Sequence, residues 1–224
     1  MPKRVIIVGS GPGLARTVAE RFGGEGWRVV MMARNIERLE SEAAALMAKG
    51  MDAVPVPCDV LDLERLDALI RREGASGGID LLNYNAAVIR PDTPILETPI
   101  EAIQSDLTID LTAAIVAARA AIPAMRARGS GTILFSGGNL GFDPWPQYLT
   151  LGVGKAGLRN AAGALAKDPA CAALRIAYVN IHAHITGEVN DELADLYYKI
   201  HTQPAEQHEW DVHYEHAYEM PTDV

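Results

Sequence analysis

The sequence predicts an α/β fold of the doubly wound type, with a mainly parallel sheet of seven strands and helices on both faces. Short apolar runs alternate with longer helical patterns along the whole chain, which is typical of β-strands connected by helices. The apolar runs are continuous, as expected for parallel strands that are covered on both faces. The 224 residues show no linker and no internal repeat, so one domain spanning 1–224 is expected.

Six strands follow from the apolar runs, and the segment 208–215 fits a short seventh. The expected strands cover residues 4–9, 27–33, 52–60, 79–87, 131–138 and 174–182. The third contains Pro55 and Pro57, which have no N–H group for a ladder of hydrogen bonds. Proline is confined largely to edge strands for this reason, so the third strand is expected at an edge of the sheet.

Helices are expected between these strands. They cover residues 14–22, 35–50, 63–73, 149–167 and 190–201, and a long helical region ends near residue 128. Asn35 stands where its side chain can cap the second helix, and Gly50 stands where that helix can end. Pro123 is expected near a bend of the long helical region, because proline removes a helical hydrogen bond.

Charge and composition exclude several classes of partner. The formal net charge is −9, which disfavours nucleic acid and anionic membranes because both would repel the surface. The apolar run at the N-terminus is too short for a signal peptide, and no segment resembles a membrane span of about 20 apolar residues. The two cysteines, Cys58 and Cys171, are expected to be reduced and buried. A cytoplasmic protein is therefore expected, without a nucleic-acid or membrane partner.

A glycine-rich stretch, "VGSGPGLA", lies where the first strand gives way to the first helix. Glycines allow the backbone to approach a ligand closely, and a helix N-terminus offers free N–H groups and a positive dipole end to a phosphate. The residues expected to face the phosphates are Gly9, Ser10, Gly11, Gly13 and Leu14. A glycine-rich run is a weak signal alone, but its place between a strand and a helix predicts a dinucleotide site.

The end of the second strand reads "MMARN" and indicates which dinucleotide binds. An acidic residue here would hydrogen-bond the 2′-hydroxyl of NAD, whereas Ala33 leaves space and Arg34 offers a guanidinium to a 2′-phosphate. Asn35 follows in the same turn. The alternative is that Arg34 is a solvated loop cation. Together with the glycine turn, the residue pattern favours NADP(H).

These motifs, in this order, resemble the short-chain dehydrogenase/reductase family. The stretch "CDV" is similar to that family's adenine contact, which implies that Asp59 and Val60 flank the adenine. "YNAA" is similar to the family's "NNAG" strand end, which implies that Asn85, Ala86 and Ala87 lie beside the cofactor. "AAIPAMRARGSGTILFS" is similar to the family's long helix and fifth strand. The resemblance covers most of the chain.

The resemblance implies a Rossmann-type sheet with strand order 3-2-1-4-5-6-7 and hydride transfer between NAD(P) and a carbonyl or alcohol. It also implies a homodimer or homotetramer, to which alanine-rich helical segments would contribute their small side chains. In the family a tyrosine acts as the acid, and a serine, a lysine and an asparagine complete the set. The phenol requires an adjacent ammonium, because its ordinary pKa near 10 makes it a poor acid–base group at neutral pH.

The catalytic positions depart from the family pattern. Lys155 matches the family lysine, but four residues earlier the chain has Leu151. The serine position is occupied by Gly138, and the helix asparagine position by Asp110. After the sixth expected strand, His182 begins the stretch that replaces the family's "PG". General acid–base catalysis contributes about 10²–10⁴-fold, so standard carbonyl reduction requires substitutes for these residues.

Two substitutes are available in the sequence. Tyr148 precedes Lys155 by seven residues, two helical turns, and Ser136 precedes the serine position by two, on the same face of a regular strand. A displaced set of Ser136, Tyr148 and Lys155 is one interpretation. The other is that Tyr148, after two nearby prolines, only lines the pocket. Asp110 is expected to pair with Lys155, either as a structural ion pair or in a proton relay.

Three functions remain open at this point. The first is an NADP(H)-dependent oxidoreductase that uses Tyr148 or a strand-end histidine, His182 or His184, as proton donor. The second is a catalytically silent NADP(H)-binding sensor or partner subunit, in which Lys155 contacts only the ribose. The third is a non-redox isomerase or dehydratase with Asp110 or a histidine as base. Ile185 is expected to contact the cofactor, and the loop at about 185–198 is expected to shape the substrate pocket but identifies no substrate. The spacing of the C-terminal histidines matches no metal site.

Overall fold

All seven strands form one parallel sheet in the computed structural model, which describes residues 2–90 and 94–216. The strands are β1 (Arg4–Val8), β2 (Arg28–Ala33), β3 (Asp52–Pro57), β4 (Leu81–Tyr84), β5 (Thr132–Ser136), β6 (Arg175–His182) and β7 (Asp211–Glu215). Their order is β3-β2-β1-β4-β5-β6-β7, which confirms the predicted topology. Every adjacent pair is parallel, so the sheet is entirely rather than mainly parallel.

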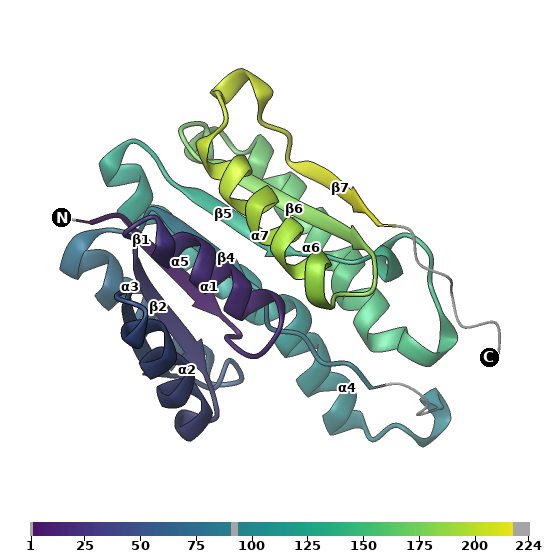
Figure 1. Ribbon diagram of the computed structural model, residues 1–224. Coiled ribbons are helices and arrows are strands. Elements are labelled where there is room, and N and C mark those ends of the chain that lie inside the picture. The colour runs from purple at the N-terminus through teal and green to yellow at the C-terminus, as the bar shows by residue number, and fades with distance from the viewer. Residues whose placement is uncertain (1, 91–93, 217–224) are drawn as a thin grey trace.

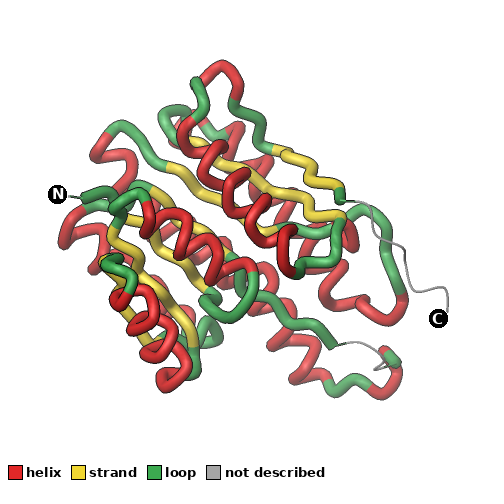
Figure 2. Tube along the Cα trace, viewed as in Figure 1, coloured by secondary structure: helices red, strands yellow, loops and turns green. Residues whose placement is uncertain are grey.

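Helices cover both faces of this sheet (Figures 1 and 2). They are α1 (Leu14–Gly24), α2 (Ile36–Ala48), α3 (Leu63–Gly77), α4 (Ile100–Leu107), α5 (Ala113–Arg128), α6 (Leu149–Lys167) and α7 (Gly187–Thr202). Buried side chains of α1, α2 and α7 form one apolar core with one face of the sheet. Those of α3, α5 and α6 form a second core with the opposite face. The fold is therefore a three-layer α/β/α sandwich.

Local signals in the sequence account for several boundaries. The Asn35 side chain accepts a hydrogen bond from the backbone N–H of Arg38 and caps α2, as expected. Gly50 follows α2 with a φ of 82°, the left-handed conformation that favours glycine. β3, with its two prolines, is an edge strand, which confirms that prediction.

The long helical region differs from the expectation in one respect. It is interrupted at Thr108–Thr112 by a π-helical turn, which separates α4 from α5, whereas Pro123 lies within α5. Such wide turns are rare and are often found at functional sites. This turn contains the buried residue Asp110.

The same region, Ile100–Arg128, is long and apolar enough to cross a membrane by length and composition. The sequence analysis had predicted that no segment of the chain is long and apolar enough to span a membrane. In the structure, small side chains of α5 are buried in the core, and α5 packs closely against α3. Part of the apolar character of this region is therefore buried in the core.

The strand order places a break in winding direction between β1 and β4. From β1 the chain continues outward through β2 to β3, then crosses to β4 on the other side of β1. In open parallel sheets a crevice forms at such a point, outside the carboxyl ends of the strands. The functional cleft lies there.

Candidate functional site

A cleft of about 1200 Å³ runs along the carboxyl ends of the strands. Pockets for small ligands typically measure about 300–1,000 Å³, so this cleft is large enough for an extended ligand together with a small one. The predicted site residues that line it are Gly9, Ser10, Gly11, Gly13, Leu14, Arg34, Asn35, Val60, Asn85, Ala86, Ala87, Ser136, Tyr148, Lys155 and Ile185. Asp59 and Asp110 do not line it.

The glycine turn leaves the first turn of α1 open to the cleft. Gly13 is the N-cap residue of α1, with a φ of 88°, and no side chain caps this helix. The uncapped N–H groups and the helix dipole favour an anion at this point. Ser10 lies in the same turn with its residue only 2% exposed, and its hydroxyl has no hydrogen-bond partner among the described residues. Together these groups form a cradle with unused donors, which fits a phosphate.

Two guanidinium groups lie beside this turn. Arg34 is exposed, lines the cleft and makes no hydrogen bond or ion pair with the described residues. Arg38, on the first turns of α2, also lines the cleft, and its Nη2 lies 3.5 Å from the carbonyl oxygen of Ser10. Its Nε lies 3.7 Å from the carboxylate of Glu42. The sequence analysis did not predict Arg38. Its position four residues after Arg34, in the helix that Asn35 caps, could have indicated it.

The segment after β3 provides an apolar wall. Val60 and Cys58 both line the cleft and are buried. Burial raises the pKa of the Cys58 thiol to about 11, so this cysteine is a packing group rather than a nucleophile. The carboxylate of Asp59 accepts a hydrogen bond from the backbone N–H of Leu61 at 3.0 Å. Asp59 therefore stabilises the turn that carries Val60.

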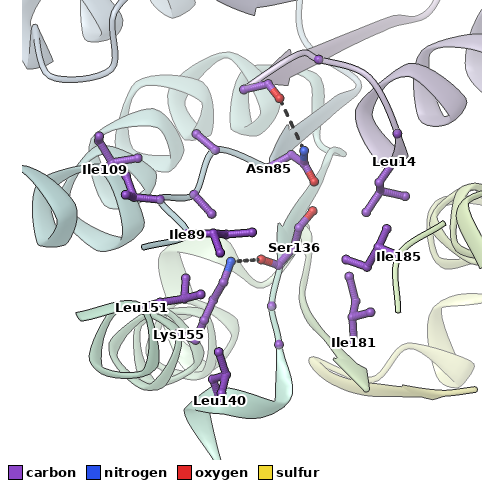
Figure 3. Close-up of a pocket in the computed structure, with 18 of the residues that line it drawn as sticks. Leu14, Asn85, Ile89, Ile109, Ser136, Leu140, Leu151, Lys155, Ile181 and Ile185 are labelled. Carbon is purple, nitrogen blue, oxygen red and sulfur yellow. Dashed lines mark hydrogen bonds between the residues drawn. The ribbon is translucent and has the colours of Figure 1, made fainter. Parts of the chain in front are cut away.

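The end of β4 is fixed to the end of β1. The backbone N–H of Asn85 donates to the carbonyl oxygen of Val8 at 2.8 Å, and its side-chain amide donates to that of Gly9 at 3.4 Å (Figure 3). Asn85 and Ala86 thus form part of the cleft wall opposite α6. Ala87 and Ile89 continue this wall.

Lys155 extends from α6 into the cleft (Figure 3). The residue is 8% exposed, and its ammonium donates to the carbonyl oxygen of Ser136 at 2.7 Å. Burial lowers the pKa of Lys155, and the negative charge of Asp110 opposes that shift. Leu151 lies one helical turn before Lys155 and presents an apolar side chain to the same cleft.

Asp110 lies in the π-helical turn between α4 and α5, against Gly154 of α6. One carboxylate oxygen accepts a hydrogen bond from the backbone N–H of Val88 at 2.8 Å, and the other is buried without a hydrogen-bond partner among the described residues. The expected direct ion pair with Lys155 is not formed, because the carboxylate is directed to Val88 and the lysine to Ser136. Burial raises the pKa of Asp110 to about 6, against the opposing effects of the Val88 hydrogen bond and of Lys155.

The other candidate catalytic groups are not joined to Lys155 through their hydroxyls. The Ser136 hydroxyl accepts hydrogen bonds from Tyr197 on α7 at 2.8 Å and from the Asn83 amide at 3.2 Å. Tyr148 is half-buried at the N-terminus of α6, with its ring 6.4 Å from that of Trp145. It lines the cleft but has no hydrogen bond to Lys155.

The remaining wall comes from the ends of β5 and β6. His182, His184 and Ile185 line the cleft after β6, as do Asn139 and Trp145 after β5. A Cβ atom added to Gly138 would meet no atom of the described residues within 4 Å.

The amino-acid sequence is similar to those of known proteins over most of its length. A family model described as short chain dehydrogenase matches residues 3–195. The chain is 29% identical over 198 residues to 3-oxoacyl-[acyl-carrier-protein] reductase of Bos taurus, covering 86% of this chain and 81% of that protein. It is 28% identical over 177 residues to human dehydrogenase/reductase SDR family member 4, covering 78% of this chain and 63% of that protein.

Solved structures share the fold across nearly the whole chain. A short-chain dehydrogenase from Rhodopseudomonas palustris superposes with a TM-score of 0.87 at 22% identity, covering 96% of this chain and 99% of that chain. A metagenomic short-chain oxidoreductase in complex with NADP also has a TM-score of 0.87, at 23% identity, covering 95% and 96% of the two chains. The all-parallel order of seven strands is common to this fold.

Proposed function

The chain belongs to the short-chain dehydrogenase/reductase family, whose members are NAD(P)-dependent oxidoreductases, and we propose that it is an NADP(H)-dependent oxidoreductase with a non-standard proton donor. Its substrate would be a carbonyl compound or the corresponding alcohol. Three kinds of observation support this: a cradle for the phosphates, cations for a 2′-phosphate, and a buried ammonium in the same cleft. The cations placed for a 2′-phosphate, Arg34 and Arg38, carry the proposed preference for NADP(H).

The dinucleotide fits the residues present. The uncapped N-terminus of α1 and the unpartnered Ser10 hydroxyl would receive the pyrophosphate. Arg34 and Arg38 would bracket the 2′-phosphate, where an acidic residue would repel it. The related structure that binds NADP supports the same assignment. When bound, the cofactor supplies or accepts the hydride, and the protein positions the substrate and moves the proton.

A first experiment measures affinity and turnover separately. Calorimetry with NADPH and NADH should give binding of both, with NADPH at least tenfold tighter. NADPH consumption in the presence of a panel of ketones and aldehydes should then identify a substrate. Absence of affinity for either nucleotide would contradict the proposal as a whole.

A second candidate is a catalytically silent NADP(H)-binding protein, which acts as a sensor or partner subunit. The observation that favours it is the apolar Leu151 beside Lys155, with Gly138 opening onto empty space, because neither residue has a proton to donate. Tight NADPH binding with no turnover across the panel would favour this function over the first.

A further inference from the structure

We propose that Lys155 is itself the proton donor of this site and that Asp110 acts through it, as the positioning group that keeps the ammonium charged. This inference rests on the oxidoreductase function proposed above. It replaces Tyr148 and the strand-end histidines as the source of the proton. It also gives Asp110 a role in the reaction although Asp110 does not line the cleft.

The first argument is the number of donors on Lys155. An ammonium group has three N–H donors, and one of them is engaged by the carbonyl oxygen of Ser136. No other hydrogen bond from this nitrogen is present among the described residues, although the residue is 92% buried. Since Lys155 lines the cleft, the remaining donors are available to a ligand bound there.

The second argument is the space around the ammonium. Leu151 lies one turn earlier on the same helix and lines the cleft with an apolar side chain. Gly138 adds no side chain on the opposite side. Neither position therefore supplies a polar side chain that would compete with Lys155 for a substrate oxygen.

The third argument is the unused oxygen of Asp110. The residue is fully buried, and one carboxylate oxygen has no hydrogen-bond partner within residues 2–90 and 94–216. A Cβ atom added to Gly154 would lie 3.4 Å from that oxygen, which places it against the backbone next to Lys155. A buried carboxylate in this position stabilises the positive charge of the lysine without consuming any of its donors.

The surrounding charges are consistent with this arrangement. Asp106, one helical turn before Asp110, is occupied by Arg90 and Thr150. From β4, the Tyr84 phenol donates to the carbonyl oxygen of Ile109, and burial holds its pKa far above the ordinary value. At the end of β6, His182 also lines the cleft. The negative charge of Asp110 raises the pKa of Lys155, against the lowering effect of burial.

The proton balance of the reduction is simple. As hydride from NADPH reaches the carbonyl carbon, an N–H bond of the Lys155 ammonium breaks and an O–H bond forms on the substrate oxygen. The lysine is left as a neutral amine, and the product is an alcohol. The amine then takes a proton from water that enters when the product leaves. In the reverse direction the neutral amine accepts the alcohol proton.

One test measures the lysine without cofactor or substrate. The chain contains five lysines, so ε-¹³C-lysine labelling gives few signals, and Lys155→Arg identifies the one of interest. The Lys155 signal should titrate at a lower pH than the other four. In Asp110→Asn its pKa should fall further, because the stabilising charge is removed. A Lys155 signal that titrates with the others, or that is unmoved in Asp110→Asn, would overturn the proposal.

A second test uses turnover. Lys155→Arg keeps the charge and a donor to Ser136, but a guanidinium does not release its proton. It should lower kcat at least tenfold and change the Kd for NADPH less than threefold, whereas Lys167→Arg on the same helix should change neither. In Asp110→Asn the alkaline limb of the kcat profile should move to lower pH. Full kcat in Lys155→Arg would show a lysine that only binds the cofactor and would overturn the proposal.

The titration and the turnover assays together separate a failure of this proposal from a failure of the proposed oxidoreductase function. Suppose that no carbonyl is turned over but the Lys155 pKa is low and responds to Asp110→Asn. The oxidoreductase function and the role of Lys155 as proton donor would then both be rejected. The electrostatic coupling of the two groups would stand on the titration alone.

Discussion

Gly9 lies so close to Ala86 that the ends of β1 and β4 admit no side chain between them. A Cβ atom added to Gly9 would lie 2.4 Å from the backbone nitrogen of Ala86, far inside any real contact distance. Gly9 also has a φ of 85°, a conformation that favours glycine. Both residues line the cleft, so this close approach helps to shape its wall.

Gly9→Ala is therefore expected to be strongly destabilising. The strained φ alone costs on the order of 1–3 kcal/mol, and the contact with Ala86 forces the two strands apart in addition. Urea denaturation should show a lower midpoint, and NADPH affinity should fall. Gly24→Ala in α1 is the matched control, because a Cβ atom there meets nothing within 4 Å. A Gly9→Ala protein as stable as the control would contradict the close approach.

Arg34→Ala and Arg38→Ala test the site for the 2′-phosphate. Each variant should weaken NADPH binding about tenfold, equivalent to about 1.4 kcal/mol, through loss of a charge-assisted contact. NADH binding should change less than threefold, because that nucleotide has no 2′-phosphate. Arg72→Ala, an exposed arginine on α3, is the control. Calorimetry measures all four proteins, and equal weakening of both nucleotides would remove the proposed preference for NADP(H).

Placing a serine at position 138 and a tyrosine at position 151, the positions that the family pattern indicates, should increase turnover. Gly138→Ser meets no steric obstacle and has extended backbone with a φ of −179°, and Leu151→Tyr places a phenol one turn from Lys155. Because acid–base catalysis contributes about 10²–10⁴-fold, the double variant should raise kcat at least tenfold on a carbonyl that the family reduces. The gain should disappear when Lys155→Met is added. A double variant that binds NADPH without any gain would show that these positions do not face the reacting carbonyl.

Asp110→Asn should change how stability depends on pH. The pKa of Asp110 is about 6 in the folded protein, against an ordinary value of 3.8. A raised pKa gives stability that is fully present below about pH 4 and lost as pH rises through 6. At about 1.4 kcal/mol per pKa unit the loss is up to about 3 kcal/mol. Asparagine does not titrate, so the variant should gain stability relative to the original protein between pH 4 and 7.

Denaturation at a series of pH values measures this difference. Asp67→Asn is the control, because its pair with Arg71 lowers the pKa of Asp67, which leaves the carboxylate ionised in both states above pH 5. Its difference from the original protein should be constant between pH 5 and 8. A difference for Asp110→Asn that is equally constant would show that the carboxyl titrates normally.

Periodicity and local signals in the sequence were sufficient for the layers of this fold. Continuous apolar runs marked the strands, Asn35 marked the start of α2, and the prolines of β3 marked an edge. These signals are readable because they act over a few neighbouring residues. The resemblance to a known family supplied the strand order, which local patterns do not determine.

The sequence by itself predicted that a glycine turn, an arginine after the second strand and Lys155 belong to one cleft, and all three line it. Only the tertiary structure decided how their polar groups are used. It directed Lys155 to the carbonyl oxygen of Ser136 and Asp110 to the N–H of Val88, where a direct ion pair was expected. The physical reason is that hydrogen-bond partners far apart in sequence, and the burial that shifts a pKa, exist only once the elements have packed.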